Sequence, residues 1–460
     1  MSRPDINQQL AGARILPLLI KLTIPATVAQ LVNALYSIVD RMYIGHMPEI
    51  GTIALSGVGL TFPITLLISA FSFLPGRGGA PLASIAIGEG DLKKAQKYLS
   101  NAAIVLLVIS AVITTAGLLF IEPLLTLFGA KVDTMPYALE YLRTYLLGTV
   151  FVEFSLGLNP FINSQGFTTI GTVSVAIGAF LNILLDPLFI YTLDMGVRGA
   201  ALASVISQMI SCIWIVVFLM SKRSYIRLRW KTLRLDRDIL FSTFALGVSP
   251  FTFRVNESLV TAFLNRLLLA WGGADAGLHL AVMTILSSVS QVFFMPLSGI
   301  VSGAQPILSY NFGARNYARI RETIHHARVL GVICAACMWF VMVVFPEAVC
   351  SVFSDDPALI PLAKDAMRLM FSTVLIMGFQ MINQNAFVAM GNARCSFLFA
   401  LMRKVLILIP LACILPRFFG VWGIYAAEMV SNPITTIITF VVFERYMRKI
   451  QDDFASSAAR

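Results

Sequence analysis

The chain has 460 residues, of which 58% are hydrophobic and only 13% are charged, and its mean hydropathy is +0.82. A soluble domain carries about 25% charged residues, so this chain lacks the polar side chains needed to cover a water-facing surface of its size. These figures exclude a soluble multidomain enzyme. The excess of 34 Lys and Arg over 24 Asp and Glu could indicate nucleic-acid binding, but in a hydrophobic chain it is typical of loops beside a membrane.

Long apolar segments predict an all-α, polytopic membrane protein. A helix needs about 20 mostly apolar residues to cross the hydrocarbon core of a bilayer. Twelve segments meet this requirement: 15–41, 52–75, 98–121, 136–160, 167–191, 199–221, 239–270, 280–304, 326–346, 366–388, 396–415 and 421–443. Between the second and third spans, the glycine-rich stretch LPGRGGAP around Arg77 is expected to be irregular.

The charges of the loops predict which side of the membrane they face. The loop after the sixth span, 222–238, holds seven Lys and Arg beside two Asp. Connections after odd-numbered spans, such as 46–51 and 271–277, are short and poor in positive charge. The positive-inside rule therefore places both termini and the 222–238 loop in the cytoplasm. Topology alone accounts for the charge of this loop, although binding to lipid or nucleic acid is an alternative.

The sequence repeats itself with a shift of 225 residues. The shift aligns the following pairs: Pro25 and Pro250, Arg41 and Arg266, Pro81 and Pro306, Gly88 and Gly313, Phe128 and Phe353, Arg143 and Arg368, and Gly166 and Gly391. Near the end the register slips by one, which pairs Gly196 with Gly420 and Gly199 with Gly423. We therefore predict two pseudo-symmetric six-helix bundles, 1–221 and 239–460, joined by the basic linker 222–238. Parallel repeats of this kind are typical of transporters that work by alternating access.

Ionisable residues inside the spans are few, and each is a functional candidate because a charge within a membrane is costly. Asp40 ends the first span, and Asp186 lies in the fifth. Asn182 precedes Asp186 by four residues, so their side chains share one face of a helix. Asn33 and Tyr36 lie on the same helix face as Asp40.

Two carboxylates that meet in a low-dielectric site would not both ionise easily. Such a pair could hold a proton, or exchange it for a cation such as Na⁺ bound by Asp40, Asn182 and Asp186, which is the chemistry of ion coupling. Alternatively, Asp40 pairs with Arg41 at the membrane edge. Under the repeat, Asp40 corresponds to Asn265 and Asp186 to an apolar stretch without an acid, so the ion site is expected in the first bundle.

Three other acids lie within spans. Glu257 follows Arg254 by three residues, which permits an intrahelical ion pair, or else a second ion or substrate site in the second bundle. Glu153 and Glu428 are isolated acids that could line a cavity. The sequence has no phosphate-binding G-x-x-x-x-G-K-[ST] motif, so transport would use an ion gradient, with H⁺ or Na⁺ as coupling ion and no cofactor.

Four stretches of the sequence resemble the multidrug and toxic compound extrusion (MATE) family, most closely its DinF-like and MepA-like bacterial branch. They are VDRMYIGH after the first span, GGAPLASIAIGEGD after the second, its repeat counterpart AQPILSYNFGARNYARI, and the Asn182-x-x-x-Asp186-Pro187 run. The resemblance covers essentially the whole chain. It implies twelve spans in two bundles around a central cavity, and export of bulky organic cations in exchange for H⁺ or Na⁺.

The resemblance also implies roles for individual residues. Its ion site corresponds to Asp40 of the first helix, Asn182 and Asp186 of the fifth, and Ser204, a hydroxyl of the sixth. Tyr141 and Asn159 fall where relatives place further polar groups of this network, and Pro25 where some members bend. Another branch is similar but keeps its coupling acids in the second lobe, near the position of Glu257.

Two other functions compete with cation export. A flippase for lipid-linked precursors would need a more cationic cavity. A membrane-embedded enzyme would need clustered catalytic groups, whereas the four His lie at loops or helix ends. We therefore expect a non-enzymatic, monomeric transporter in the plasma (inner) membrane of a bacterium, whose partners are small cationic molecules and the bilayer and not nucleic acid.

Overall fold

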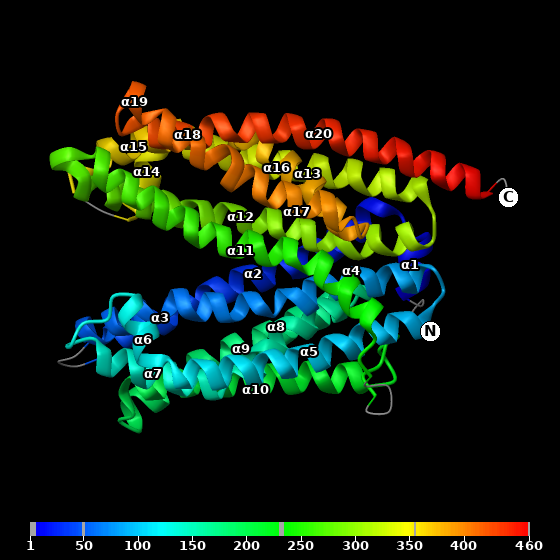
Figure 1. The fold of residues 1–460 in the computed structure, drawn as a ribbon, viewed down its shortest axis with the longest axis horizontal. Helices are drawn as coiled ribbons and strands as arrows, with labels where there is room; N and C mark the ends of the chain where they lie inside the picture. Colours follow the sequence, from blue (N-terminus) through cyan, green and yellow to red (C-terminus); the bar gives the residue numbers. More distant parts are fainter. Residues whose placement is uncertain (1–5, 48–50, 230–233, 354–355, 459–460) are drawn as a thin grey trace. The chain divides into compact units, whose positions relative to one another are not determined.

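The computed structural model describes residues 6–47, 51–229, 234–353 and 356–458, and these residues form helices with no strand. The first half of the chain contains α1 (Ile6–Gly12), α2 (Ile15–Gly45), α3 (Gly51–Phe71), α4 (Phe73–Gly88), α5 (Leu92–Leu119), α6 (Ile121–Leu127), α7 (Met135–Leu147), α8 (Thr149–Ser164), α9 (Thr168–Pro187), η1 (Leu188–Thr192) and α10 (Gly196–Met220). The second half contains α11 (Arg237–Trp271), η3 (Gly273–Asp275), α12 (Ala276–Gly313), α13 (Tyr317–Val344), α14 (Pro346–Ser351), α15 (Leu359–Phe371), η4 (Val374–Ile376), α16 (Met377–Ala389), α17 (Ala393–Leu401), η5 (Met402–Leu408), α18 (Ile409–Ile414), α19 (Pro416–Phe419) and α20 (Trp422–Ala458). Figure 1 shows them in sequence colours.

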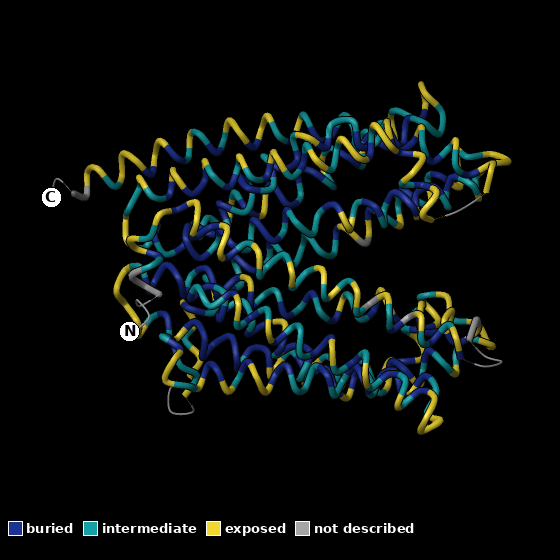
Figure 2. The backbone as a smooth tube through the Cα atoms, turned by 180° about the vertical axis from the view of Figure 1, so that it is seen from behind, coloured by how far each residue is buried: buried dark blue, intermediate teal, exposed yellow. Residues whose placement is uncertain are grey.

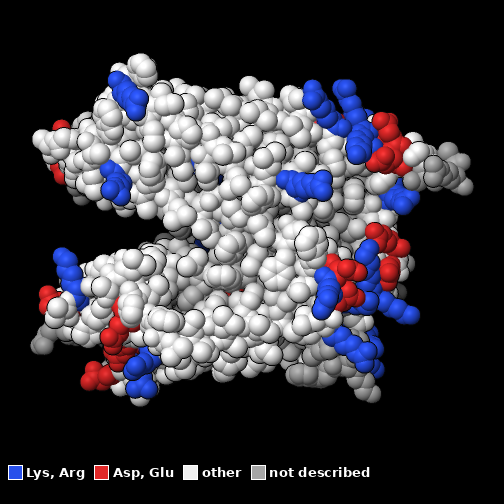
Figure 3. All heavy atoms as spheres, viewed as in Figure 1, with Lys and Arg blue, Asp and Glu red and all other residues white. Residues whose placement is uncertain are grey.

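Most of these helices are built to cross a membrane. Within the described residues, nine are long and apolar enough to do so, and ten if the bent pair α7 and α8 is one span. The other two predicted spans are also helical: α11 carries several charged residues, and the tenth span is divided into α15, η4 and α16. Most charged side chains visible in Figure 3 lie toward the ends of the helices, which leaves largely uncharged flanks suited to lipid.

Internal contacts divide the chain into two compact units. The N-terminal unit comprises Met1–Gly12 and Val28–Phe251, and the C-terminal unit comprises Ala13–Thr27 and Thr252–Arg460. Consequently α2 and α11 are each divided between the two units, with one part of the helix in each. The repeat-related prolines of these helices, Pro25 and Pro250, lie next to the points where the helices change unit. Buried positions alternate with exposed ones along the helices (Figure 2), as expected where each helix packs on one side only.

The predicted repeat is confirmed in local structure. The α5 helix and its counterpart α13 have the same length and start 225 residues apart. Asp91 caps the first turn of α5 by accepting a hydrogen bond from a backbone amide, and Asn316 caps α13 in the same way. The one-residue slip is also present, because Gly196 and Gly420 both have positive φ, at 54° and 58°. The bundle boundaries at 221 and 239 stay predictions, since the compact units exchange parts of two helices.

Close backbone contact joins α4 to the first half of α11 within the N-terminal unit. A Cβ atom at Gly78 would collide with the backbone of Thr243 and Gly247, and one at Gly247 would collide with Leu74. Small residues let membrane helices approach this closely. The prediction that LPGRGGAP is irregular is therefore wrong: the stretch is helical, and its glycines serve helix packing instead of a turn.

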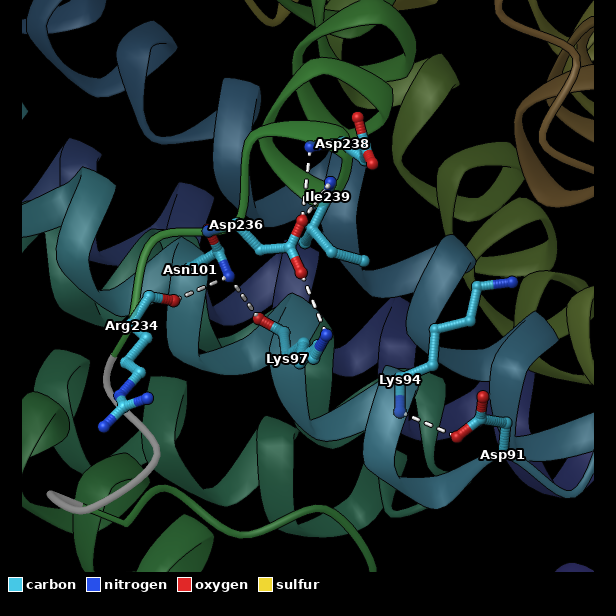
Figure 4. Close-up of polar contacts among 8 residues, drawn as sticks. All are labelled: Asp91, Lys94, Lys97, Asn101, Arg234, Asp236, Asp238 and Ile239. Carbon is cyan, nitrogen blue, oxygen red and sulfur yellow. Dashed lines mark hydrogen bonds and ion pairs between the residues drawn. The ribbon is translucent and has the colours of Figure 1, made fainter.

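The basic linker is attached to the N-terminal unit at the start of α5 (Figure 4). Lys97 Nζ donates to Asp236 Oδ2 at 2.9 Å, Asn101 Oδ1 accepts from the Asp236 amide at 2.9 Å, and Asn101 Nδ2 donates to the Arg234 carbonyl at 3.2 Å. The Asp236 carboxylate also accepts from the first amides of α11. The hydrogen bond from Lys97, together with these amides, holds the pKa of Asp236 below its usual value, so the ion pair persists at neutral pH.

A second attachment uses Gln165, at the end of α8. Its buried side-chain oxygen accepts hydrogen bonds from Ser224 Oγ at 3.0 Å and from the backbone amides of Tyr225 and Ile226 at 2.8 and 3.3 Å. The linker is thus fixed by two neutral amides, Asn101 and Gln165, besides its charges.

Replacing Gly78 by Val tests the α4–α11 contact. The added methyl groups have no space, and overpacking of this kind costs about 1–3 kcal/mol. The matched control is Gly59→Val in α3, where no atom lies within 4 Å of an added Cβ. Thermal unfolding of the purified proteins in detergent should show a lower midpoint for Gly78→Val alone; equal midpoints would contradict the contact.

Removing the side chain of Asn101 should loosen the linker. In Asn101→Ala the Asp236 amide loses its acceptor and the Arg234 carbonyl loses its donor, so hydrogen exchange at residues 234–240 should become faster. Asn385→Ala is a suitable control, because the Asn385 side chain donates within its own helix. Unchanged exchange in Asn101→Ala would show that the linker is held by other contacts.

Candidate functional site

Three of the predicted site residues meet between α9 and α10. Asn182 and Asp186 lie one turn apart on α9, and Asn182 Nδ2 donates to Asp186 Oδ1 at 3.2 Å. The same Nδ2 lies 3.2 Å from Ser204 Oγ on α10. All three side chains are buried. The i,i+4 spacing on α9 and the packing of α9 against α10 therefore place a carboxylate, an amide and a hydroxyl together inside the N-terminal unit.

The second half of α2 adds a further carboxylate to this cluster. Tyr36 Oη lies 3.5 Å from Ser204 Oγ. Asp40 is one turn further along α2, is buried, and lies close enough to Asp186 for their charges to interact. Tyr141 is buried on α7, within electrostatic range of Tyr36, Asp40 and Asp186. The structure therefore brings both predicted acids into one place, together with their polar neighbours.

The cluster offers oxygen atoms to a ligand. Among the described residues, Asn182 Oδ1 and Asp186 Oδ2 are buried and accept no hydrogen bond. Unsatisfied buried oxygens of this kind are costly unless a proton or a cation reaches them. Carboxylate, amide and hydroxyl oxygens are ligands that suit hard cations. The chain then changes helix type at η1, and such π-helical turns frequently accompany functional sites.

Two predicted members of the network lie elsewhere. Asn159 donates to the Gly171 carbonyl at 2.9 Å and to Ser174 Oγ at 2.8 Å. Ser174 precedes Asn182 by eight residues on α9, which is about 12 Å along a helix axis. Asn33 is exposed on α2, apart from the buried cluster. The structure therefore does not bring Asn159 or Asn33 into contact with the acid pair.

The remaining acids have distinct surroundings. Arg254 Nη1 and Glu257 Oε2 are 3.5 Å apart on α11, in the i,i+3 ion pair that the spacing permits. Glu428 pairs with Lys404 at 2.6 Å. Glu153 is fully buried, and neither of its carboxylate oxygens has a hydrogen-bond partner among the described residues. In this structure Glu153 is therefore not in contact with a solvent-accessible cavity, and its cavity-lining role stays a prediction.

Pro25 lies inside α2, which continues as one helix through it. Two residues later, α2 passes from the C-terminal unit to the N-terminal unit that holds Asp40. The proline is thus placed where a bend would move Asp40 relative to α9 and α10, and the bend itself stays a prediction.

Comparison with known proteins agrees with the predicted family. A family model described as MatE matches residues 25–188 and 255–414. The multidrug export protein MepA of Staphylococcus haemolyticus is 26% identical over 435 residues, which cover 94% of each chain.

Two solved structures share the fold. A MATE protein in its bent conformation superposes with a TM-score of 0.91 at 23% identity, over 99% of this chain and 100% of the other. The outward-facing conformation of a multidrug resistance MATE family transporter of the MOP superfamily gives a TM-score of 0.89 at 22% identity, over 98% and 100%. Because the family model covers more than half of the sequence, in both halves of the repeat, the chain belongs to the MatE family.

Proposed function

We propose that the protein is a secondary multidrug efflux transporter that exports bulky organic cations in exchange for H⁺ or Na⁺. The observation that carries this function is the buried cluster of Asp40, Asp186, Asn182 and Ser204 inside the membrane-spanning helices of the N-terminal unit. Membership of the MatE family and the names of the MepA relatives support multidrug export. The acidic cluster favours cationic cargo over the anionic precursors that a lipid flippase would carry.

The coupling of ion binding to helix movement follows from the energetic cost of burying two negative charges near each other. When both carboxylates are ionised, they repel each other across a low-dielectric space. Binding of a proton to one carboxylate removes this repulsion, and so does binding of a Na⁺ ion by Asp40, Asp186 and Asn182 Oδ1. Neutralisation therefore favours a closer approach of α2 to α9 and α10, and bending at Pro25 would allow it.

Release of the substrate is linked to this step. If ion binding changes the position of α2 and so weakens substrate binding, substrate binding must weaken ion binding by the same factor. The exchange of one for the other is then obligatory, and an ion gradient drives export. We place the transporter in the bacterial inner membrane as a monomer. Both termini and the basic linker lie in the cytoplasm in this proposal, because the positive charge of the loops supports that orientation.

Neutral substitutions of the acid pair test the site. In a bacterium that lacks its own pumps, Asp186→Asn and Asp40→Asn should each reduce ethidium efflux by about tenfold or more, the effect of losing one charge-assisted interaction. Glu122→Gln, an exposed acid on α6, is the matched control and should export normally. Normal efflux by both Asp variants at equal expression would refute the site.

Purified protein in liposomes identifies the coupling ion. A pH gradient and a Na⁺ gradient are imposed in separate experiments. At least one of them should drive ethidium transport by the wild type. The same gradient should not drive transport by Asp186→Asn. The amide of this variant neither takes up a proton nor supplies the negative charge that binds Na⁺. If neither gradient drives transport, ion-coupled export is wrong.

A further inference from the structure

The basic linker is held to α5 through its backbone and not through its own basic side chains. Gln96 Nε2 of α5 donates to the Arg227 carbonyl at 2.8 Å, and Asn101 Nδ2 of the same helix donates to the Arg234 carbonyl at 3.2 Å. In Figure 4 the Arg234 side chain points away from Asp236 and Asn101. The two carbonyls are bound five residues apart on α5, so the linker follows the first turns of this helix and its cationic groups stay available.

Six cations at this end of the N-terminal unit form no ion pair with any described residue. One lies at the start of α5 and five lie in the linker, and we call them the basic surface: Lys93, Lys222, Arg223, Arg227, Arg234 and Arg237. Five of them are exposed. The sixth, Arg227, is half-buried, and its guanidinium donates to the backbone carbonyls of Lys222 and Ser224 at 3.2 and 3.4 Å. Its charge therefore lies beside that of Lys222 without being neutralised.

The acids of this region are too few to balance its cations. Together, the segments 89–97 and 222–238 hold ten Lys and Arg but only four Asp and Glu. Two of these acids are already paired with other lysines of α5: Glu89 with Lys94 at 3.1 Å, and Asp236 with Lys97 at 2.9 Å. A concentrated excess of positive charge therefore remains on the basic surface, and such an excess attracts anionic groups.

Exposed apolar side chains border the basic surface. Phe241 is 78% exposed, and it follows Arg237 by one turn on the same face of α11. Leu92 and Leu235 are 47% and 57% exposed, and each is next in sequence to a residue of the basic surface. The candidate membrane spans Leu92–Leu119 and Gly196–Met220 begin and end here. Cationic and apolar groups thus lie side by side at the end of these spans, as expected where headgroups meet acyl chains.

We propose that the basic surface binds the phosphate headgroups of anionic phospholipids, such as phosphatidylglycerol, in the leaflet that adjoins the linker. Clusters of Lys and Arg next to a membrane span attract anionic lipids, and each residue raises the affinity by about fivefold. The guanidinium groups match the geometry of phosphate oxygens. The exposed leucines and Phe241 favour a ligand with acyl chains over a soluble polyanion such as nucleic acid. This inference depends neither on the exported substrate nor on the coupling ion.

Counting the lipids bound to the full-length protein tests the proposal. Protein in a neutral detergent is titrated with phosphatidylglycerol and, separately, with phosphatidylcholine, and bound lipid is counted by native mass spectrometry. The wild type should bind phosphatidylglycerol more tightly. Two double variants, Arg234→Gln with Arg237→Gln and Lys222→Gln with Arg223→Gln, each remove two charges. Each should lower the ratio of the two affinities by about 25-fold, which is about fivefold for each charge.

A matched double variant removes the same charge from the other end of the N-terminal unit. Lys131 lies between α6 and α7, and Arg198 lies at the start of α10, at the end of that helix opposite to the linker. Both are exposed. Lys131→Gln with Arg198→Gln should leave the affinity ratio unchanged. The substituted side chains are exposed in all three double variants, so their thermal unfolding midpoints in detergent should equal that of the wild type.

Soluble competitors separate the possible ligands of the basic surface. The titration with phosphatidylglycerol is repeated with glycerol 3-phosphate, and again with a single-stranded oligonucleotide, each at the concentration of the lipid. Neither should displace the lipid. Displacement by either one assigns the surface to a soluble phosphate or to nucleic acid and overturns the phospholipid site. An affinity ratio that is the same in the wild type and both basic-surface variants also overturns it, as does an equal fall in the Lys131 and Arg198 control.

Discussion

The N-terminal unit depends on one constraint: Asp40 and Asp186 are both buried among membrane-spanning helices, close enough for their charges to interact. Each ionised acid loses the solvation of water, and the pair repels across a medium of low dielectric constant. Asn182 reduces this cost with one hydrogen bond to Asp186, but Asn182 Oδ1 and Asp186 Oδ2 have no donor among the described residues. In the proposed function, a small cation or a proton completes the cluster. Because Asp40 and Asp186 come from α2 and α9, distant in sequence, the ligand set exists only while these helices pack together. In the proposed mechanism, ion binding is therefore coupled to the position of these helices.

The two halves of the repeat share a fold but differ in the polar side chains that they bury. Both halves keep the same caps and the same glycine turns, for example at Asp91 and Asn316. The acid pair occurs only in the first half, since the second half has Asn265 at the position of Asp40 and an apolar stretch at that of Asp186. A shared backbone thus carries different polar side chains in its two halves, as expected when function depends on side chains placed on a common scaffold.

Local patterns in the sequence were sufficient for much of the fold and for part of the site. Apolar runs and loop charges predict the spans, because the membrane imposes their length and composition. The Asn182–Asp186 contact is predictable because helix geometry fixes an i,i+4 pair. The prediction of an irregular LPGRGGAP segment was wrong, because glycine in a membrane helix also permits close packing.

Contacts between distant segments were beyond the reach of such patterns. The position of Asn159 beside Ser174 depends on how α8 packs against α9, which sequence spacing does not determine. Gln165 binds a linker about 60 residues away, a contact that no local pattern indicates. Ser204 was placed by family resemblance, and its contact with Asn182 gives a physical reason for that placement.

Obligatory exchange between substrate and ion is tested most directly by the ions that leave the protein when substrate binds. Ethidium is added to purified wild-type protein in weakly buffered detergent solution, while a pH indicator and a Na⁺-selective electrode record the medium. Binding should release H⁺ or Na⁺ in proportion to the bound dye, and the release should disappear in Asp186→Asn. Stoichiometric binding of ethidium to the wild type with no release of either ion would contradict coupling through the buried carboxylates.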